Sequence, residues 1–204
     1  MKSTQRAGRA AAGTRAVVPR RNDRPVLPDV LGPKLRVVFC GTAAGAASAR
    51  REAYYAGPGN RFWATLFEAG FVGEALTPER YREVLRFGVG LTDLAKHEAG
   101  NDDELSEGAF DVDGFLERIE TVAPQIIAFT SKNAARAFLG RDVDYGLVRE
   151  RLGDTRLYVL PSPSGAARGA WSIAPWRRLA RMVGAGEMTR RAAASRRRGT
   201  RRAP

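Results

Sequence analysis

A short apolar run that ends in glycine constrains the possible fold more than any other feature of this chain. The run covers residues 35–40, Leu-Arg-Val-Val-Phe-Cys, and the small residues Gly-Thr-Ala-Ala-Gly follow it at 41–45. Such a run is typical of a buried strand, and small residues after a strand let backbone N–H groups approach a ligand. The pattern therefore predicts an α/β fold with a binding loop at 41–45.

The same order of strand, loop and helix recurs further along the chain. Residues 126–129 and 156–160 predict two more strands, and the second of these leads into a loop at 161–165, Pro-Ser-Pro-Ser-Gly. Helices are expected at 59–70, 78–87, 113–122, 132–139 and 176–183, and residues 88–93 are expected to lead into a polar loop. Alternating elements of this kind favour a parallel sheet with helices on both faces, where two loops meet over one sheet edge.

Charge divides the chain into one domain and two basic tails. Residues 1–34 hold eight Lys or Arg against two Asp, and residues 187–204 hold seven Arg against one Glu, whereas the residues between them are neutral in sum. Both tails lack apolar periodicity, which predicts disordered segments at 1–34 and 187–204 around a domain at 35–186. The tails can contact phosphates without reading sequence, or they are solvated ends with no specific role.

Composition also excludes several classes of protein. Cys40 is the single cysteine and His97 the single histidine, so a disulfide, a four-cysteine iron–sulfur cluster and a zinc site are not expected, and no metal or cofactor is predicted. No apolar stretch reaches the length of about 18 residues that a membrane span needs, and the Arg-rich start lacks a secretory apolar run. We expect a cytoplasmic, nucleoid-associated monomer, with an organellar address as the alternative that this composition leaves open.

Four motifs together indicate a family. Residues 41–45 lack the Gly-Lys-Ser/Thr of a phosphate-binding P-loop and the full glycine fingerprint of a dinucleotide fold. Residues 35–41, Gly-Pro-Gly-Asn-Arg-Phe-Trp at 57–63, Gly-Leu-Thr-Asp at 90–93 and Val-Leu-Pro-Ser-Pro-Ser-Gly at 159–165 resemble the mismatch-specific members of the uracil-DNA glycosylase superfamily. The resemblance spans about residues 35–185. It implies a three-layer α/β/α sandwich around a short, mainly parallel sheet of four or five strands.

The resemblance also implies a pocket that receives one base flipped out of DNA. Tyr55 lies where the family places the aromatic residue that stacks on the base, with an ordinary core tyrosine as the alternative. The residues implied to contact the base are Gly41, Ala43, Ala44, Gly45, Tyr55, Asn60 and Ser162. Asn60 is also expected to cap the helix that follows it. Phe62 and Trp63 are expected to pack in the core.

A second loop is implied to wedge into the duplex. Residues 162–168, Ser-Pro-Ser-Gly-Ala-Ala-Arg, resemble the family loop that fills the gap left by the base, and a plain surface turn is the alternative. The residues implied to contact DNA are Ser164, Gly165, Ala166, Ala167 and Arg168. Ser162 departs from the His or Asn that relatives commonly carry at the start of this loop, which weakens the expected donor toward the base.

The first loop departs further from the family. Many relatives place Asn or Asp two residues after the glycine to position the attacking water, and this chain has Ala43. Either the catalytic group has moved, or the protein binds damaged DNA without efficient cleavage. Glycosidic cleavage builds oxocarbenium-like charge, so a carboxylate near the sugar and donors near the base can supply the stabilisation.

Asp93 is the first candidate for the relocated group, because Gly-Leu-Thr-Asp at 90–93 matches a segment where relatives place a pocket residue. It is expected to accept from a pyrimidine N3–H or to hold the water, with a helix cap as the alternative. Asp102 and Asp103 are reserve candidates, and Glu52 and His97 rank below them. Thr42 is a further catalytic candidate through its hydroxyl or backbone N–H, or it is simply the end of a strand.

These observations predict a monofunctional glycosylase that removes uracil, with other deaminated bases as further substrates, and leaves an abasic site. Its partner is DNA that contains uracil or related damage. One rival is a damage-binding or abasic-site-binding protein of the same fold with little turnover, which Ala43 and Ser162 favour. Another rival is a general nucleic-acid-binding module that acts through its Arg-rich tails.

Overall fold

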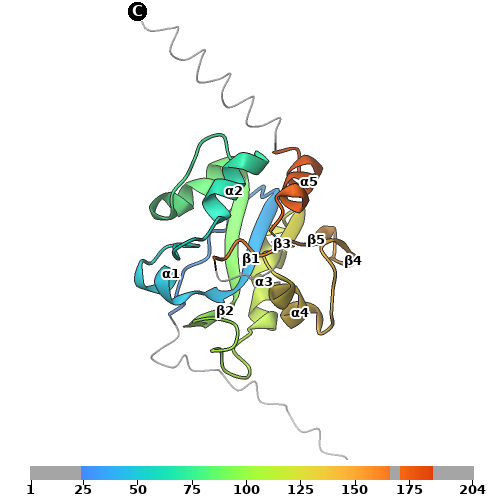
Figure 1. The fold of residues 1–204 in the computed structure, drawn as a ribbon. Coiled ribbons are helices and arrows are strands. Elements are labelled where there is room, and N and C mark those ends of the chain that lie inside the picture. Colours follow the sequence, from blue (N-terminus) through green and yellow to red (C-terminus); the bar gives the residue numbers. More distant parts are fainter. Residues whose placement is uncertain (1–23, 166–170, 186–204) are drawn as a thin grey trace, which may run out of the picture.

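Five strands form the central sheet of the computed structural model, which describes residues 24–165 and 171–185 (Figure 1). They are β1 (Val37–Ala44), β2 (Val89–Ala99), β3 (Ile126–Phe129), β4 (Gly146–Leu152) and β5 (Thr155–Val159). Their order across the sheet is β2-β1-β3-β5-β4. β4 runs antiparallel to β5 and the other neighbours are parallel, so the predicted mainly parallel sheet is confirmed.

Helices cover both faces of the sheet (Figure 1). They are α1 (Ala46–Arg50), α2 (Phe62–Ala69), the 3-10 helix η1 (Pro78–Phe87), α3 (Val112–Val122), α4 (Lys132–Leu139) and α5 (Ala174–Met182). The side chains of Asp111 and Ser131 cap the starts of α3 and α4 by accepting from backbone N–H groups. The predicted helix positions are confirmed, although residues 78–87 form 3-10 turns.

Strand β1 is the centre of two separate cores. Val37 and Phe39 point into a cluster with side chains of α2, η1 and α5, whereas Val38 and Cys40 point into a cluster with side chains of α3 and α4. Successive side chains of a strand face opposite sides, so one continuous apolar run fills both layers. This alternation produces the three-layer α/β/α sandwich.

Phe39 connects β1 to the helices on its side. Its ring meets Phe62 of α2 and Phe71 edge to face, at centroid distances of 5.4 and 5.1 Å, and stacks on Trp176 of α5 at 5.4 Å. Aromatic pairs with these geometries contribute about 0.5–1.5 kcal/mol each beyond their burial. The cluster therefore fixes β1 relative to α2 and α5.

The chain already packs on the domain before residue 35. Leu27 and Val30 are buried, and Val30 forms an antiparallel bridge with Leu91 of β2. The part of the expected N-terminal tail at 24–34 is therefore folded, because its few apolar side chains meet the open edge of β2. Residues 1–23 and 186–204 lie outside the described residues.

The sheet extends beyond the predicted strands. Residues 41–44 were expected in a loop, but they continue β1 and stay paired with β2, through Gly41 opposite Asp93 and Ala43 opposite Ala95. Glycine and alanine give no apolar signal for a strand, yet their small side chains allow the ladder to continue. That part of the loop prediction was wrong.

Two strands lacked a clear sequence signal. β2 covers the segment from Val89 that was expected to enter a loop, and its apolar pattern is broken by the buried polar residues Thr92, Asp93 and Lys96. β4 is a charged edge strand, Gly-Leu-Val-Arg-Glu-Arg-Leu, in which most side chains are exposed or half-buried. Edge strands commonly carry charges, which hide them from apolar patterning.

Candidate active site

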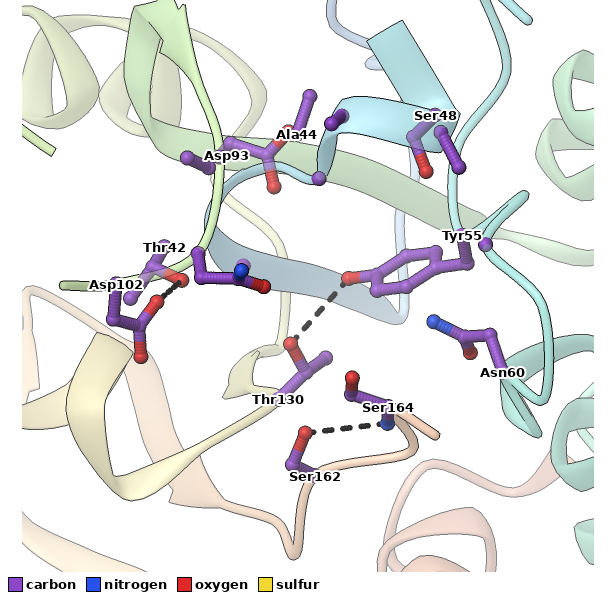
Figure 2. A pocket seen from close by; sticks show the side chains of 18 of the residues that line it. Thr42, Ala44, Ser48, Tyr55, Asn60, Asp93, Asp102, Thr130, Ser162 and Ser164 are labelled. Carbon is purple, nitrogen blue, oxygen red and sulfur yellow. Dashed lines mark hydrogen bonds between the residues drawn. The ribbon is translucent and has the colours of Figure 1, made fainter. Parts of the chain in front are cut away.

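A pocket of about 870 Å³ lies beyond the carboxyl ends of the central strands. Its walls come from the end of β1, from α1 and the segment 54–60, from the loop at 100–103, from residues 130–133 and from the loop at 162–164 (Figure 2). The predicted site residues that line it are Gly41, Thr42, Ala43, Ala44, Gly45, Tyr55, Asn60, Asp93, Ser162 and Ser164. The fold thus brings these walls together with Asp93 of β2, from parts of the chain that lie far apart in the sequence.

Gly41 leaves the space that the Asp93 carboxylate occupies, near the Tyr55 hydroxyl. The two strands place Gly41 directly opposite Asp93. A Cβ atom on residue 41 would collide with the Asp93 carboxylate and lie 3.7 Å from the Tyr55 hydroxyl. A larger residue here would have to displace the Asp93 carboxylate, and no unusual backbone angle is involved.

Asp93 is a buried acid inside the strand β2, not a helix cap. It is 4% exposed, and among the described residues none donates a hydrogen bond to its carboxylate. The pKa of Asp93 is raised to about 7, because burial raises it strongly, the charge of Lys96 lowers it in part, and the charge of Asp29 adds a smaller increase. A carboxyl group with this pKa exists in both protonation states near neutral pH, as acid–base groups require.

A buried ion pair lies behind Asp93, and sequence reasoning missed it. Lys96 is 5% exposed, with its Nζ 2.7 Å from Asp29 Oδ1, and it also donates to the Tyr54 hydroxyl at 3.2 Å. Asp29 further accepts from Thr92 at 2.7 Å and pairs with Arg118 at 3.0 Å. The charges of Lys96 and Asp29 compensate each other, which leaves Asp93 as the buried acid of the pocket without a direct partner. A lysine inside an otherwise buried run was the available sequence signal.

Tyr55 presents its ring at one wall of the pocket. Its ring stacks on Phe62 at a centroid distance of 3.7 Å and an angle of 15°, and its hydroxyl lies 3.5 Å from Thr130 Oγ1 (Figure 2). Tyr55 has a φ of 53°, in the left-handed region that side chains rarely adopt. Burial keeps its pKa well above the ordinary value, so the hydroxyl stays neutral. Tyr55 packs in the core and also lines the pocket.

The segment 57–60 holds the second loop in place. Asn60 accepts from the backbone of Phe62 at 2.9 Å, so it supports the start of α2 while lining the pocket. Arg61 N–H donates to Pro163 O at 2.8 Å, and a Cβ on Gly165 would lie 2.8 Å from Pro58 O. Gly165 therefore allows the two loops to touch backbone to backbone. Ala166, Ala167 and Arg168 lie outside the described residues.

Thr42 forms a hydrogen bond to Asp102 that the sequence did not predict. Its hydroxyl donates to Asp102 at 2.5 Å, and Asp102 also accepts from Asn133 of α4 at 2.5 Å. Asp102 and Asp103 both line the pocket with Asn133, whereas Glu52 and His97 are exposed and do not line it. Ser48 and Thr130 are further pocket residues that the sequence did not single out, since isolated hydroxyl residues carry no pattern.

The described residues, 24–165 and 171–185, contain neither a cluster of potential metal ligands nor a membrane-spanning helix. Within these ranges, no group of three or more His, Cys, Asp or Glu side chains is arranged to hold a metal ion. No helix in the same ranges is long and apolar enough to cross a membrane.

Replacing Gly41 with alanine is expected to damage the pocket while preserving the fold. The new methyl group must displace the Asp93 carboxylate, so we expect any reaction that depends on this carboxylate to slow by about tenfold or more, because small misplacements of catalytic groups cost up to about 100-fold. Gly32→Ala is the matched control, since its Cβ would make only an ordinary 3.6 Å contact with Leu85 outside the pocket. Equal rates in the two variants would show that the position of Asp93 is unimportant.

The fold and the pocket define an α/β domain with an acid-containing cavity at the ends of its parallel strands. The family model of the uracil DNA glycosylase superfamily matches residues 28–180. The chain therefore belongs to the uracil DNA glycosylase superfamily and is a DNA glycosylase of the base-excision repair class.

A solved structure supports the fold. The solution NMR structure of a protein from Methanosarcina acetivorans, described as a putative uracil DNA glycosylase, superposes with a TM-score of 0.56. The two sequences are 24% identical, and the match covers 79% of this chain and 98% of that one. At this identity the similarity concerns the fold alone.

Proposed function

We propose that this protein is a monofunctional uracil-DNA glycosylase that flips uracil out of DNA and hydrolyses its N-glycosidic bond. The observation that carries the proposal is the position of Asp93. This buried acid has no direct partner, and its carboxylate fills the space next to Gly41, near the Tyr55 hydroxyl. Burying an acid lowers the stability of the folded protein, so the presence of a buried acid in a pocket favours a chemical role.

Asp93 suits the polar edge of uracil when it is protonated. Its carbonyl oxygen can accept from the N3–H of the base, and its hydroxyl can donate to a neighbouring base oxygen. The donated hydrogen bond strengthens as the departing base gains negative charge. We infer that Asp93 in its neutral form binds the base and stabilises it as a leaving group.

Tyr55 supplies the other half of base recognition. Stacking on an aromatic ring contributes about 1–3 kcal/mol per base, whichever base is bound. Phe62 stacks on the Tyr55 ring and holds it in place, and residues 41–45 line the same pocket. This arrangement agrees with uracil and also with other deaminated bases, which offer a similar pattern of N–H and carbonyl groups.

The proposed enzyme acts as a monomer in the nucleoid of the cytoplasm.

The loop that begins at Ser162 is proposed to contact the DNA. Ser162 accepts from the Ser164 backbone N–H at 3.3 Å, and contacts with residues 58–61 fix the loop at the pocket. Small residues in a fixed turn can approach a phosphate through backbone N–H groups. The proposed DNA contacts at 166–168 belong to the residues that the structure does not describe.

The test is time-resolved formation of abasic sites with excess enzyme on single-stranded and duplex DNA that contains one uracil. Release of uracil in single-turnover conditions supports the proposal. A damage-binding protein, which the apolar side chain of Ala43 favours, binds the same DNA without releasing the base. Duplexes with hypoxanthine or xanthine distinguish a different base preference from a complete lack of activity.

Truncation separates the glycosylase from a module that acts through its tails. Residues 24–185 are expected to release uracil at a rate within a few fold of the full chain when enzyme saturates the DNA, since they include all the pocket residues that the described part of the chain provides. Binding by the truncated chain should depend less steeply on salt, because the removed segments carry 13 Lys or Arg residues. Loss of all uracil-specific binding on truncation would support the rival function.

A further inference from the structure

Asp102 is held at the pocket by two other elements of the fold. One carboxylate oxygen accepts from Thr42 Oγ1 of β1 at 2.5 Å, and the other accepts from Asn133 Nδ2 of α4 at 2.5 Å. A carboxylate with one short hydrogen bond on each oxygen has a fixed orientation, and each oxygen keeps a lone pair for another donor. Such support on both sides is typical of preorganised functional groups.

The loop that carries Asp102 is itself well fixed. Gly100 N–H donates to Ala44 O at 3.0 Å, which ties the start of the loop to the end of β1. Asn101 N–H donates to Glu104 at 2.6 Å, and Ser106 N–H donates to Glu98 at 2.9 Å. These bonds hold the loop against the ends of β1 and β2 and within itself.

The pocket contains two acids in different environments. Asp93 is buried, whereas Asp102 is exposed and lies with Thr42 across the cavity from Tyr55 (Figure 2). A flipped nucleotide enters base first, and its deoxyribose stays bonded to the DNA strand outside the protein. The base must therefore occupy the buried end, and the sugar the open end. Asp102 lines the pocket and is exposed, so it lies toward the open end.

We propose that Asp102 is the catalytic carboxylate at the sugar, which holds the attacking water and stabilises the cationic deoxyribose, with Thr42 and Asn133 as its positioning residues. The inference deepens the proposed glycosylase function and rests on it. Asp102 would thus supply what Ala43 lacks, from a loop that lies next to the end of β1 through the Gly100–Ala44 hydrogen bond.

Water replaces the base at C1′ of the deoxyribose in the proposed step. The bond between C1′ and the base nitrogen breaks, and its electron pair leaves with the base. The oxygen of the water forms the new bond to C1′, and the water gives one proton to Asp102. The departing base takes up a proton from the neutral Asp93 carboxyl, and both acids exchange protons with solvent afterwards. The products are the free base and an abasic site.

The test compares Asp102→Asn with wild type in single-turnover release of uracil at saturating enzyme. Asparagine retains the size and most hydrogen bonds but neither the charge nor the basicity, so we expect a loss of about 100-fold or more, as for a positioned general base. Binding to DNA with 2′-fluoro-2′-deoxyuridine, whose fluorine slows cleavage, should change less than threefold. A structural role for Asp102 would instead weaken binding and rate together.

Two positioning variants and one control complete the experiment. Thr42→Val and Asn133→Ala each remove one hydrogen bond to Asp102 and should slow cleavage by about tenfold, with little further loss when combined with Asp102→Asn. Asp142→Asn is the control, because it removes an exposed carboxylate that pairs with Arg136 of α4 and does not line the pocket. If the wild type releases the base and Asp102→Asn releases it at the same rate, the inference about Asp102 is overturned and the proposed function stands. Absence of base release by the wild type on uracil, hypoxanthine and xanthine DNA overturns the proposed function itself.

Discussion

Replacing Asp93 with alanine is expected to slow single-turnover uracil release by about 100-fold or more, the contribution typical of a positioned acid–base group. The variant loses the donor to the departing base and the acceptor for its N3–H at once. Asp93→Asn keeps one donor and one acceptor of similar size, so it should retain more activity than Asp93→Ala. The measurement is the rate of abasic-site formation with excess enzyme at saturating DNA.

The pH dependence of the same rate tests the protonation state. The pKa of Asp93 is raised to about 7, mainly by burial, so the neutral form predominates below that pH. If the neutral form stabilises the leaving base, the wild-type rate falls as pH rises through about 7, and Asp93→Asn shows no such fall. A wild-type rate that rises through the same range, with Asn as inactive as Ala, would assign Asp93 to water activation instead.

A loss of activity in Asp93→Asn should not reflect unfolding. The pKa of Asp93 is higher in the folded protein than the ordinary 3.8, so its stabilising contribution is complete below about pH 4 and is lost as pH rises through about 7. At pH 8 the folded wild type carries a buried charge without a direct partner. Asp93→Asn is therefore expected to unfold at an equal or higher denaturant concentration at pH 8.

Replacing Phe39 with alanine is expected to lower the free energy of unfolding by about 3–5 kcal/mol, as large-to-small changes of buried aromatic residues do. The fully buried ring contacts Phe62, Phe71 and Trp176, so its removal leaves a cavity bordered by three aromatic side chains. Denaturant unfolding at 25 °C measures the change.

Phe67→Ala is the matched control for Phe39→Ala. Phe67 lies on α2 and is 47% exposed, so its replacement should change stability by less than about 1 kcal/mol. Similar losses in the two variants would indicate that the aromatic cluster around Phe39 is not the centre of the core.

Because Phe62 also supports Tyr55, a residual folded fraction of Phe39→Ala should bind uracil DNA more weakly than wild type.

The sequence by itself determined the general organisation of the domain. The apolar runs at 35–40 and 126–129 predicted strands at the centre of the sheet, because central strands are buried on both faces and must be apolar throughout. The motifs at 57–63, 90–93 and 159–165 identified the family and the segments that line the pocket. These features are local, so they can be recognised without a structure.

Only the tertiary structure decided which residues meet and how they are ionised. β2 and β4 escaped prediction because buried polar residues and an exposed charged edge hide the apolar pattern. The contact of Asp102 with Thr42 and Asn133 joins residues far apart in sequence, as does the pair of Lys96 with Asp29. The pKa of Asp93 likewise follows from burial and from charges on other segments. Solvent exclusion and electrostatic interactions depend on distances in space, and sequence spacing does not specify those distances.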